Sequence, residues 1–240
     1  MNTFIFDLDG TLLPMPSVEK FLDAYLKAIS VKMLPYGFEP SKFIKALMAG
    51  TQLMINNDGS MTNEDRFWKE FERILGDGVR QYEEVFDDFY HNEFDVAKAT
   101  TYTHPLAASC IQLLKIKGYQ LILATNPVFP RVATYTRMLW AGLEPKDFEL
   151  ITTYEVSSYC KPNLEYYKEI LYMTGKEPKD CIMVGNDVRE DMCAASLGLD
   201  TFLLKDCLIC PEGEDIKDIK QGSFEELYAM IDSLPSISKL

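Results

Sequence analysis

Short apolar segments alternate along this chain with longer stretches whose apolar residues recur at helical spacing. A continuous apolar run of roughly four to eight residues predicts a strand that is buried on both faces of a sheet. Such runs lie near residues 3–8, 120–125, 148–152, 181–185 and 200–204. Helix-like stretches lie near residues 105–117, 129–141, 163–174, 189–197 and 223–233. This alternation predicts an α/β fold in which helices cover both faces of a parallel sheet.

The pattern changes between Thr11 and about Thr100, where no run resembles a strand. Amphipathic stretches in this part predict helices near residues 17–34, 40–49, 63–75 and 79–92. The third of them opens with Thr62-Asn63-Glu64-Asp65, which is typical of a helix N-terminus. The segment therefore predicts an all-helical unit inserted after the first strand.

Two carboxylates follow directly on the first apolar run. Phe4-Ile5-Phe6 continues into Asp7-Leu8-Asp9-Gly10-Thr11. Side chains two positions apart share a face of a strand, so Asp7 and Asp9 would emerge together at its carboxyl edge. Acids held this close repel each other unless a cation or a shared proton compensates. Because ligands bind at this edge of open parallel sheets, the pair predicts a functional site.

Three further polar segments follow apolar runs or lead into helices. The four elements, in chain order, are Asp7–Thr11, Thr125–Asn126, Lys161–Pro162 and Gly185–Asp191. The order Asp-x-Asp-Gly-Thr, Thr, Lys-Pro and Gly-Asn-Asp-x-x-x-Asp resembles the haloacid dehalogenase superfamily of phosphatases and related phosphoryl-transfer enzymes. The resemblance extends over residues 7–191 and depends on four ordered motifs, which makes it much more specific than any one of them.

The resemblance implies a Rossmann-like core with a helical cap inserted between the first and second motifs. On this basis we expect residues 1–14 and 100–240 to form the α/β core domain. Residues 15–99 would form the cap.

The resemblance also implies how the two aspartates act. Asp7 occupies the position of the family's nucleophile, which attacks phosphorus and forms an acyl phosphate, so that one difficult displacement becomes two easier ones. Asp9 would be the general acid for the departing alkoxide and then the general base for the hydrolytic water. An acid at position 9 favours a phosphatase or a phosphomutase over a dehalogenase.

Several residues are expected to bind the phosphoryl group. Gly10 and Thr11 would let backbone N–H groups approach its oxygens, because no side chain intervenes at the glycine. Thr125 offers a hydroxyl donor, and the N–H of Asn126 lies beside it. Lys161 would supply fixed positive charge to the nucleophile and the phosphoryl group.

The expected cofactor is Mg²⁺, which would cancel the repulsion between the nucleophile and a dianionic substrate. The resemblance implies that the Asp7 carboxylate and the Asp9 backbone carbonyl are ligands. Either Asn186 or Asp187 completes the set, because Mg²⁺ prefers carboxylate oxygen but also accepts an amide oxygen. Asp191 is expected to orient Lys161 or a metal-bound water.

The two residues before Asp191 are not expected to belong to the functional site. Arg189 and Glu190 begin the next predicted helix. We expect both to be ordinary surface charges.

Composition narrows the classes of partner. The 240 residues carry a formal net charge of −13, with a pI near 4.6, so the chain repels nucleic-acid phosphates and anionic membranes. No apolar run approaches the roughly 20 residues that span a bilayer. The six cysteines are scattered, mostly in apolar contexts, as reduced thiols often are. We expect a cytoplasmic protein that acts on a small phosphorylated metabolite and binds neither nucleic acid nor membrane.

Two alternatives remain open at this point. A phosphomutase would use the same aspartates and return the phosphoryl group to a bound intermediate. A non-catalytic phosphate- or metal-binding protein on this scaffold is the other alternative, although intact Asp7, Asp9, Thr125 and Lys161 argue against it. No segment of the cap shows a pattern that assigns the substrate.

Overall fold

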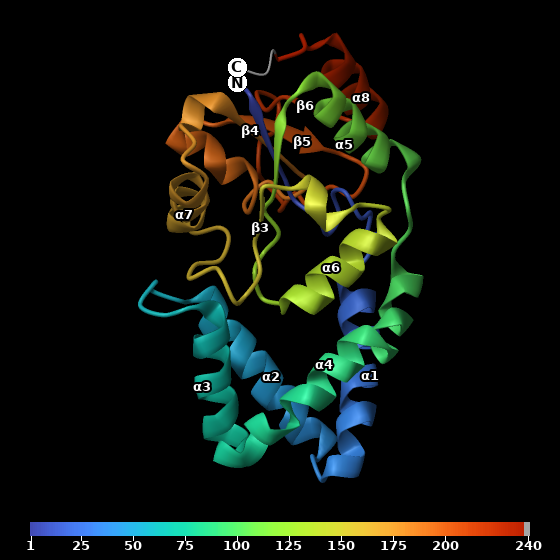
Figure 1. Ribbon diagram of the computed structural model, residues 1–240, viewed down its shortest axis with the longest axis vertical. Helices are drawn as coiled ribbons and strands as arrows, with labels where there is room; N and C mark the ends of the chain where they lie inside the picture. Colours follow the sequence, from blue (N-terminus) through green and yellow to red (C-terminus); the bar gives the residue numbers. More distant parts are fainter. Residues whose placement is uncertain (238–240) are drawn as a thin grey trace.

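In the computed structural model, which describes residues 1–237, a six-stranded sheet lies between layers of helices (Figure 1). Every strand pairing is parallel, and the order is β3-β2-β1-β4-β5-β6. The strands are β1 (Thr3–Phe6), β2 (Gln120–Leu123), β3 (Leu150–Ile151), β4 (Cys181–Gly185), β5 (Asp200–Leu204) and β6 (Gln221–Gly222). The predicted α/β fold class, a parallel sheet with helices on both faces and a helical insertion, is confirmed.

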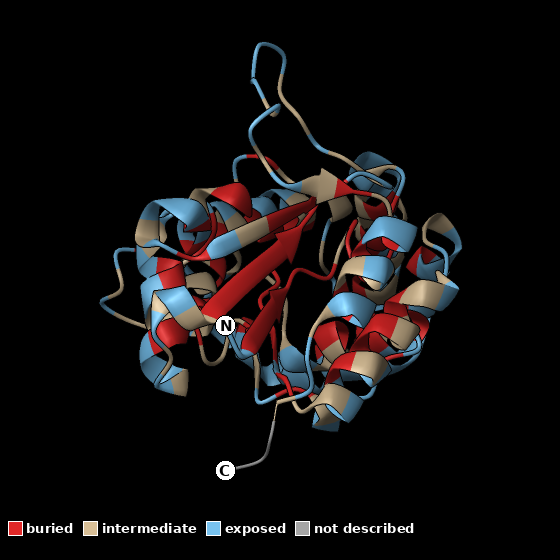
Figure 2. Cartoon of the chain, turned by 90° about the horizontal axis from the view of Figure 1, so that it is seen from above, coloured by how far each residue is buried: buried red, intermediate tan, exposed pale blue. Residues whose placement is uncertain are grey.

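The central strand β1 is buried on both faces, which explains its continuous apolar sequence. Phe4 and Phe6 face the helices α5 (Pro105–Lys117) and α8 (Phe224–Ser233), whereas Ile5 faces α7 (Leu164–Thr174). Figure 2 shows these buried strands between two layers of helices. The remaining helices of this part are α6 (Arg131–Trp140) and the 3₁₀ segments Pro145–Asp147, Pro178–Asp180 and Met192–Leu197.

The inserted helices form the lower part of the molecule in Figure 1. They are α1 (Val18–Met33), α2 (Pro40–Ile55), α3 (Asn63–Leu75) and α4 (Glu83–His91), with 3₁₀ segments at Leu34–Tyr36, Asp77–Tyr82 and Glu93–Thr100. Side chains cap the first turns of α1 and α3: Ser17 accepts from the N–H of Lys20, and Thr62 accepts from the N–H of Asp65. Their apolar stripes then pack against one another.

Apolar and polar contacts join the inserted helices to the sheet. The ring of Phe94 stacks on Trp140 of α6 at 5.1 Å between centroids, and Phe21 of α1 packs edge-on against Phe129 at 6.2 Å. Asn63, at the start of α3, is fully buried and donates its amide hydrogen to the carbonyl of Pro127 at 3.1 Å. The two parts therefore share one continuous apolar cluster.

Most predicted elements occur where the pattern placed them, and four differences are the largest. The helix predicted near 189–197 is a 3₁₀ segment from Met192, because the chain first turns at Asp187. The helix predicted near 40–49 continues to Ile55. Strand β6 and the 3₁₀ segment Glu93–Thr100 were not predicted, because neither a two-residue strand nor a short 3₁₀ segment gives a clear periodic signal. The domain division at residues 15–99 stays a prediction.

No helix within residues 1–237 combines the length and the apolar character needed to cross a bilayer.

Candidate active site

Four loops meet at the carboxyl edge of the sheet. Because β1 pairs with β2 on one side and with β4 on the other, the loops that follow these three strands are neighbours. A fourth loop, between β3 and α7, joins them. The predicted residues carried by these loops are Asp7, Asp9, Gly10, Thr11, Thr125, Asn126, Lys161, Asn186, Asp187 and Asp191.

The ammonium group of Lys161 lies between two carboxylates. Its Nζ is 2.9 Å from Asp7 Oδ1 and 2.6 Å from Asp191 Oδ1, and its side chain is 1% exposed. Burial alone would lower the pKa of Lys161, but the carboxylates of Asp191 and Asp7 outweigh it and raise that pKa well above its ordinary value. Lys161 is therefore a permanent buried cation.

Asp191 is committed to holding this cation. Its second oxygen, Oδ2, accepts the N–H of Asp187 at 3.0 Å. Gly185 permits this packing, since a Cβ there would lie 2.1 Å from Asp191 Oδ2. Burial raises the pKa of Asp191, and the Lys161 ammonium partly opposes that shift. The Asp191 carboxylate thus orients Lys161, and the ammonium group of Lys161 links it to Asp7.

Thr11 connects Asp7 to Asn186. Its hydroxyl oxygen is 3.0 Å from Asp7 Oδ2 and 2.9 Å from Asn186 Oδ1, and its single proton serves one acceptor at a time. Asn186 donates its amide hydrogen to the carbonyl of Cys207 at 2.7 Å, which leaves its oxygen facing the Thr11 hydroxyl. Gly10, at a φ of +86°, packs so closely that a Cβ would lie 2.4 Å from Asn186 Nδ2.

The neighbouring Asp187 has a different role. Its Oδ1 accepts the N–H groups of Arg189 at 2.7 Å and of Glu190 at 2.9 Å. It therefore caps the turn that follows β4, as aspartate commonly does. Among the hydrogen bonds of residues 1–237, the side chain of Asn186 shares the Thr11 hydroxyl with Asp7, whereas the side chain of Asp187 bonds only within its own turn.

The backbone donors expected at Gly10 and Thr11 are already engaged. The N–H of Gly10 donates to Leu13 at 2.8 Å, and the N–H of Thr11 donates to Leu8 at 3.1 Å. Within residues 1–237, the N–H groups of Leu8, Asp9 and Asn126 donate to no hydrogen-bond acceptor. Sequence reasoning did not single out Leu8 and Asp9, because the turn's own hydrogen bonds decide which N–H groups stay free.

Asp9 lies beside a buried arginine that sequence reasoning missed. Arg137 Nε is 3.4 Å from Asp9 Oδ1, and its guanidinium stacks on the ring of Phe129 at 4.3 Å. Burial raises the pKa of Asp9, and the Arg137 charge only partly offsets this shift. Asp9 is thus suited to hold a proton at a pH where ordinary aspartates have lost theirs.

The helical pattern contains the signal that would have identified Arg137. Residues Ala133, Thr134, Arg137 and Met138 recur at the spacing of one face of α6, and all four are buried. A cation on an apolar stripe requires a buried acidic or polar partner. Which acid it meets depends on how α6 packs.

Two hydroxyl groups fix the backbone of Thr125. Its carbonyl accepts from Thr152 at 2.7 Å and from Tyr166 at 2.8 Å. Its own hydroxyl donates to Asp9 Oδ2 at 3.3 Å. The Thr125 side chain therefore lies on the Asp9 side of the site.

Glu190 is not the surface charge that the sequence predicted. The amide nitrogen of Asn126 is 3.3 Å from each of its carboxylate oxygens, and Tyr167 donates to its backbone carbonyl at 2.7 Å. Burial raises the pKa of Glu190 to about 7. The turn capped by Asp187 directs Glu190 inward, whereas Arg189 pairs with Glu214 at the surface.

The available oxygen donors suit Mg²⁺ better than a transition metal. Residues 1–237 contain no group of three or more His, Cys, Asp or Glu side chains that could hold a metal. Mg²⁺ needs only one or two carboxylates and takes its remaining ligands from other oxygens and water. The carboxylate of Asp7 and the amide oxygen of Asn186 both contact the Thr11 hydroxyl, and together they offer such a set of oxygen ligands.

Comparisons with known proteins identify the family and the fold. Residues 1–197 match the family model of the haloacid dehalogenase-like hydrolases. The glyceraldehyde 3-phosphate phosphatase of Methanothermobacter thermautotrophicus is 25% identical over 213 residues, covering 80% of this chain and 91% of that protein. The probable phosphatase IndB of Dickeya dadantii is 28% identical over 196 residues, covering 81% and 77%. A HAD phosphatase from Thermococcus onnurineus shares the fold, with a TM-score of 0.60 and 19% identity over 99% of this chain and 100% of that one.

The buried cation generates a prediction about stability. Lys161→Met should lower the free energy of unfolding by about 3–5 kcal/mol at pH 8, because Asp7 and Asp191 are left buried without their partner. A carboxyl group whose folded-state pKa is raised binds its proton more tightly when folded, so the loss should shrink at pH 5. Urea unfolding at both pH values, with EDTA present, measures it.

The control variant for this experiment is Lys168→Met. Lys168 pairs with Glu165 at 2.6 Å, but both side chains are exposed. Lys168→Met should therefore change the free energy of unfolding by less than about 1 kcal/mol. An equal loss at pH 8 and pH 5 in Lys161→Met would contradict the electrostatic explanation.

Proposed function

Because this chain belongs to the haloacid dehalogenase-like hydrolases, we propose that it is a Mg²⁺-dependent phosphatase that acts through an aspartyl-phosphate on Asp7. One observation carries the proposal. Asp7 and Asp9 follow the same strand but lie in opposite environments: Asp7 contacts a buried ammonium group, whereas burial raises the pKa of Asp9. Two carboxyl groups separated in this way can divide nucleophilic and acid–base roles between them.

In the first step, Asp7 attacks phosphorus. Lys161 holds Asp7 Oδ1 and places a fixed positive charge beside the phosphoryl oxygens. The free N–H groups of Leu8, Asp9 and Asn126 are the donors available to those oxygens. Asp9 gives its proton to the leaving oxygen, and the resulting carboxylate is stabilised by Arg137, whose Nε is 3.4 Å away.

In the second step, water hydrolyses the aspartyl-phosphate. Asp9, now ionised, takes a proton from this water and returns to its starting state. Asp7, the Asp9 backbone carbonyl and Asn186 would hold Mg²⁺, which supplies positive charge that offsets the repulsion between Asp7 and a phosphate dianion. Asp191 acts only through Lys161, which it positions.

The central experiment tests the nucleophile. Asp7→Asn should abolish Mg²⁺-dependent phosphate release from p-nitrophenyl phosphate while the protein remains folded, because the change removes charge but little volume. Rapid-quench labelling of the wild type should trap phosphate on Asp7. Substantial residual activity, after mass spectrometry has excluded deamidation to Asp, would overturn the assignment. An isomerised product without free phosphate would identify a mutase instead.

The acid role of Asp9 predicts a dependence on the leaving group. Asp9→Asn should slow turnover roughly 10²- to 10⁴-fold. In single-turnover measurements of phosphorylation, aryl phosphates should lose less than alkyl phosphates, because an aryl oxide leaves without needing a proton. Equal losses for both classes in that step would argue against general-acid catalysis by Asp9.

The loop after β4 predicts a ranking of two variants. Asn186→Ala should raise the Mg²⁺ concentration for half-activation by about tenfold or more, because its oxygen contacts the same Thr11 hydroxyl as Asp7 does. Asp187→Ala should have a smaller effect, since Asp187 caps a turn. Mg²⁺ titrations of both variants measure the ranking. The reverse order would make Asp187 the ligand, and no shift in either would exclude this loop as the metal site.

A further inference from the structure

We infer that the substrate's leaving group is a small, uncharged and mainly apolar alcohol, which enters a cavity between Asp9 and the inserted helices; this rests on the proposed phosphatase function. The cavity has a volume of about 300 Å³. Phe21, Leu22 and Leu47 from the inserted helices line it, with Val128 and Phe129 from the loop after β2. Among the described residues that line it, Asp9 is the only one that can carry a charge near neutral pH.

The position of Asp9 connects this cavity to the chemistry. The general acid must lie beside the leaving oxygen, because it donates a proton to that atom. In an in-line displacement the leaving oxygen lies opposite the nucleophile, so the rest of the alcohol continues away from Asp7. From Asp9, the lining continues into apolar side chains of α1 and α2. The organic part of the substrate therefore lies where the cavity is.

The cavity offers no partner to a second charged group. Among its described lining residues there is no Lys, Arg or His. Its two uncharged hydroxyl side chains are engaged, since Tyr25 bonds to Tyr90 at 2.9 Å and Thr51 donates to the Leu47 carbonyl at 2.9 Å. A carboxylate, a second phosphate or several hydroxyls would lose water there without gaining hydrogen bonds.

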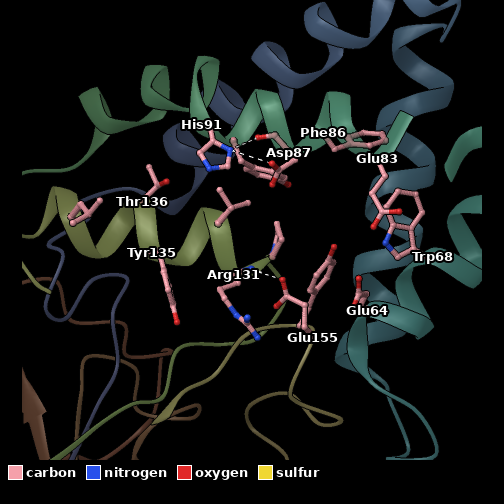
Figure 3. Close-up of a pocket in the computed structure, with 15 residues that line it drawn as sticks. Glu64, Trp68, Glu83, Phe86, Asp87, His91, Arg131, Tyr135, Thr136 and Glu155 are labelled. Carbon is pink, nitrogen blue, oxygen red and sulfur yellow. Dashed lines mark hydrogen bonds and ion pairs between the residues drawn. The ribbon is translucent and has the colours of Figure 1, made fainter. Parts of the chain in front are cut away.

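A larger cavity at the same boundary does not suit the substrate. It measures about 540 Å³ and lies between α3, α4 and α6 (Figure 3). Four carboxylates line it against one guanidinium, that of Arg131; the four are Glu64, Glu83, Asp87 and Glu155. Burial together with the charges of Glu155 and Glu83 raises the pKa of Glu64. A phosphate dianion would be repelled, and no residue of the predicted active site lines it.

The experiment compares esters that differ only in their alcohol. Straight-chain alkyl phosphates have nearly equal leaving groups, so differences in kcat/KM report the cavity. We expect kcat/KM to rise roughly fourfold for each added methylene and to level off at on the order of ten non-hydrogen atoms. Propyl phosphate should exceed glycerol 1-phosphate about tenfold or more, because two hydroxyls of the glycerol would be buried without partners.

A matched pair of variants locates the effect. Met48, at the cavity, and Leu53, outside it, both lie on α2 and are 46% and 38% exposed, so lysine is tolerated at either position. Met48→Lys should lower kcat/KM for hexyl phosphate about tenfold and raise it for an alkyl phosphate ending in a carboxylate. Leu53→Lys should change neither.

The outcomes separate the two levels of proposal. If kcat/KM for glycerol 1-phosphate equals or exceeds that for propyl phosphate, and Asp7→Asn is inactive on both, the substrate is not an ester of an apolar alcohol. The proposed phosphatase function would still hold. Identical behaviour of Met48→Lys and Leu53→Lys would overturn the assignment of this cavity. No Mg²⁺-dependent phosphate release from any ester would overturn the phosphatase and the inference together.

Discussion

The ammonium group of Lys161 is the interaction on which the rest of the site depends. Two carboxylates, Asp7 and Asp191, share this one cation, and all three groups are almost wholly inaccessible to water. Buried ion pairs add little net stability compared with apolar packing, so stability alone does not explain the arrangement. It fixes three separate loops relative to one another and, in the proposed reaction, would place positive charge beside an incoming anion.

The inserted helices help to provide the apolar, water-excluding surroundings of this charge cluster. Their aromatic residues, including Phe21 and Phe94, continue the apolar cluster of the sheet and meet Phe129 directly beyond the second motif. Electrostatic interactions strengthen where water is excluded, so the same packing that joins the two parts increases the effect of Lys161 and Arg137. The apolar packing between the two parts and the electrostatics of the site therefore depend on each other.

What the sequence could predict was local, and what it missed depends on packing. The strands were predictable because a doubly buried parallel strand must be continuously apolar, and Asp7 and Asp191 belong to short motifs with fixed spacing. Arg137 was missed because its partner is chosen by the docking of α6. Glu190 was missed because a capped turn reverses its direction, and Gln221–Gly222 is too short to show a period.

The position of β1 at the centre of the sheet has a consequence for synthesis. Its partner residues in β2 come more than a hundred positions later, and Lys161 follows Asp7 by 154. At ribosomal speed, a fully apolar strand therefore waits on the order of ten seconds for its neighbours, while the inserted helices can form from local contacts. Charged residues that flank such a strand hinder aggregation. Asp7 and Asp9, the carboxylates proposed to carry the reaction, are also the charged residues that directly follow this strand.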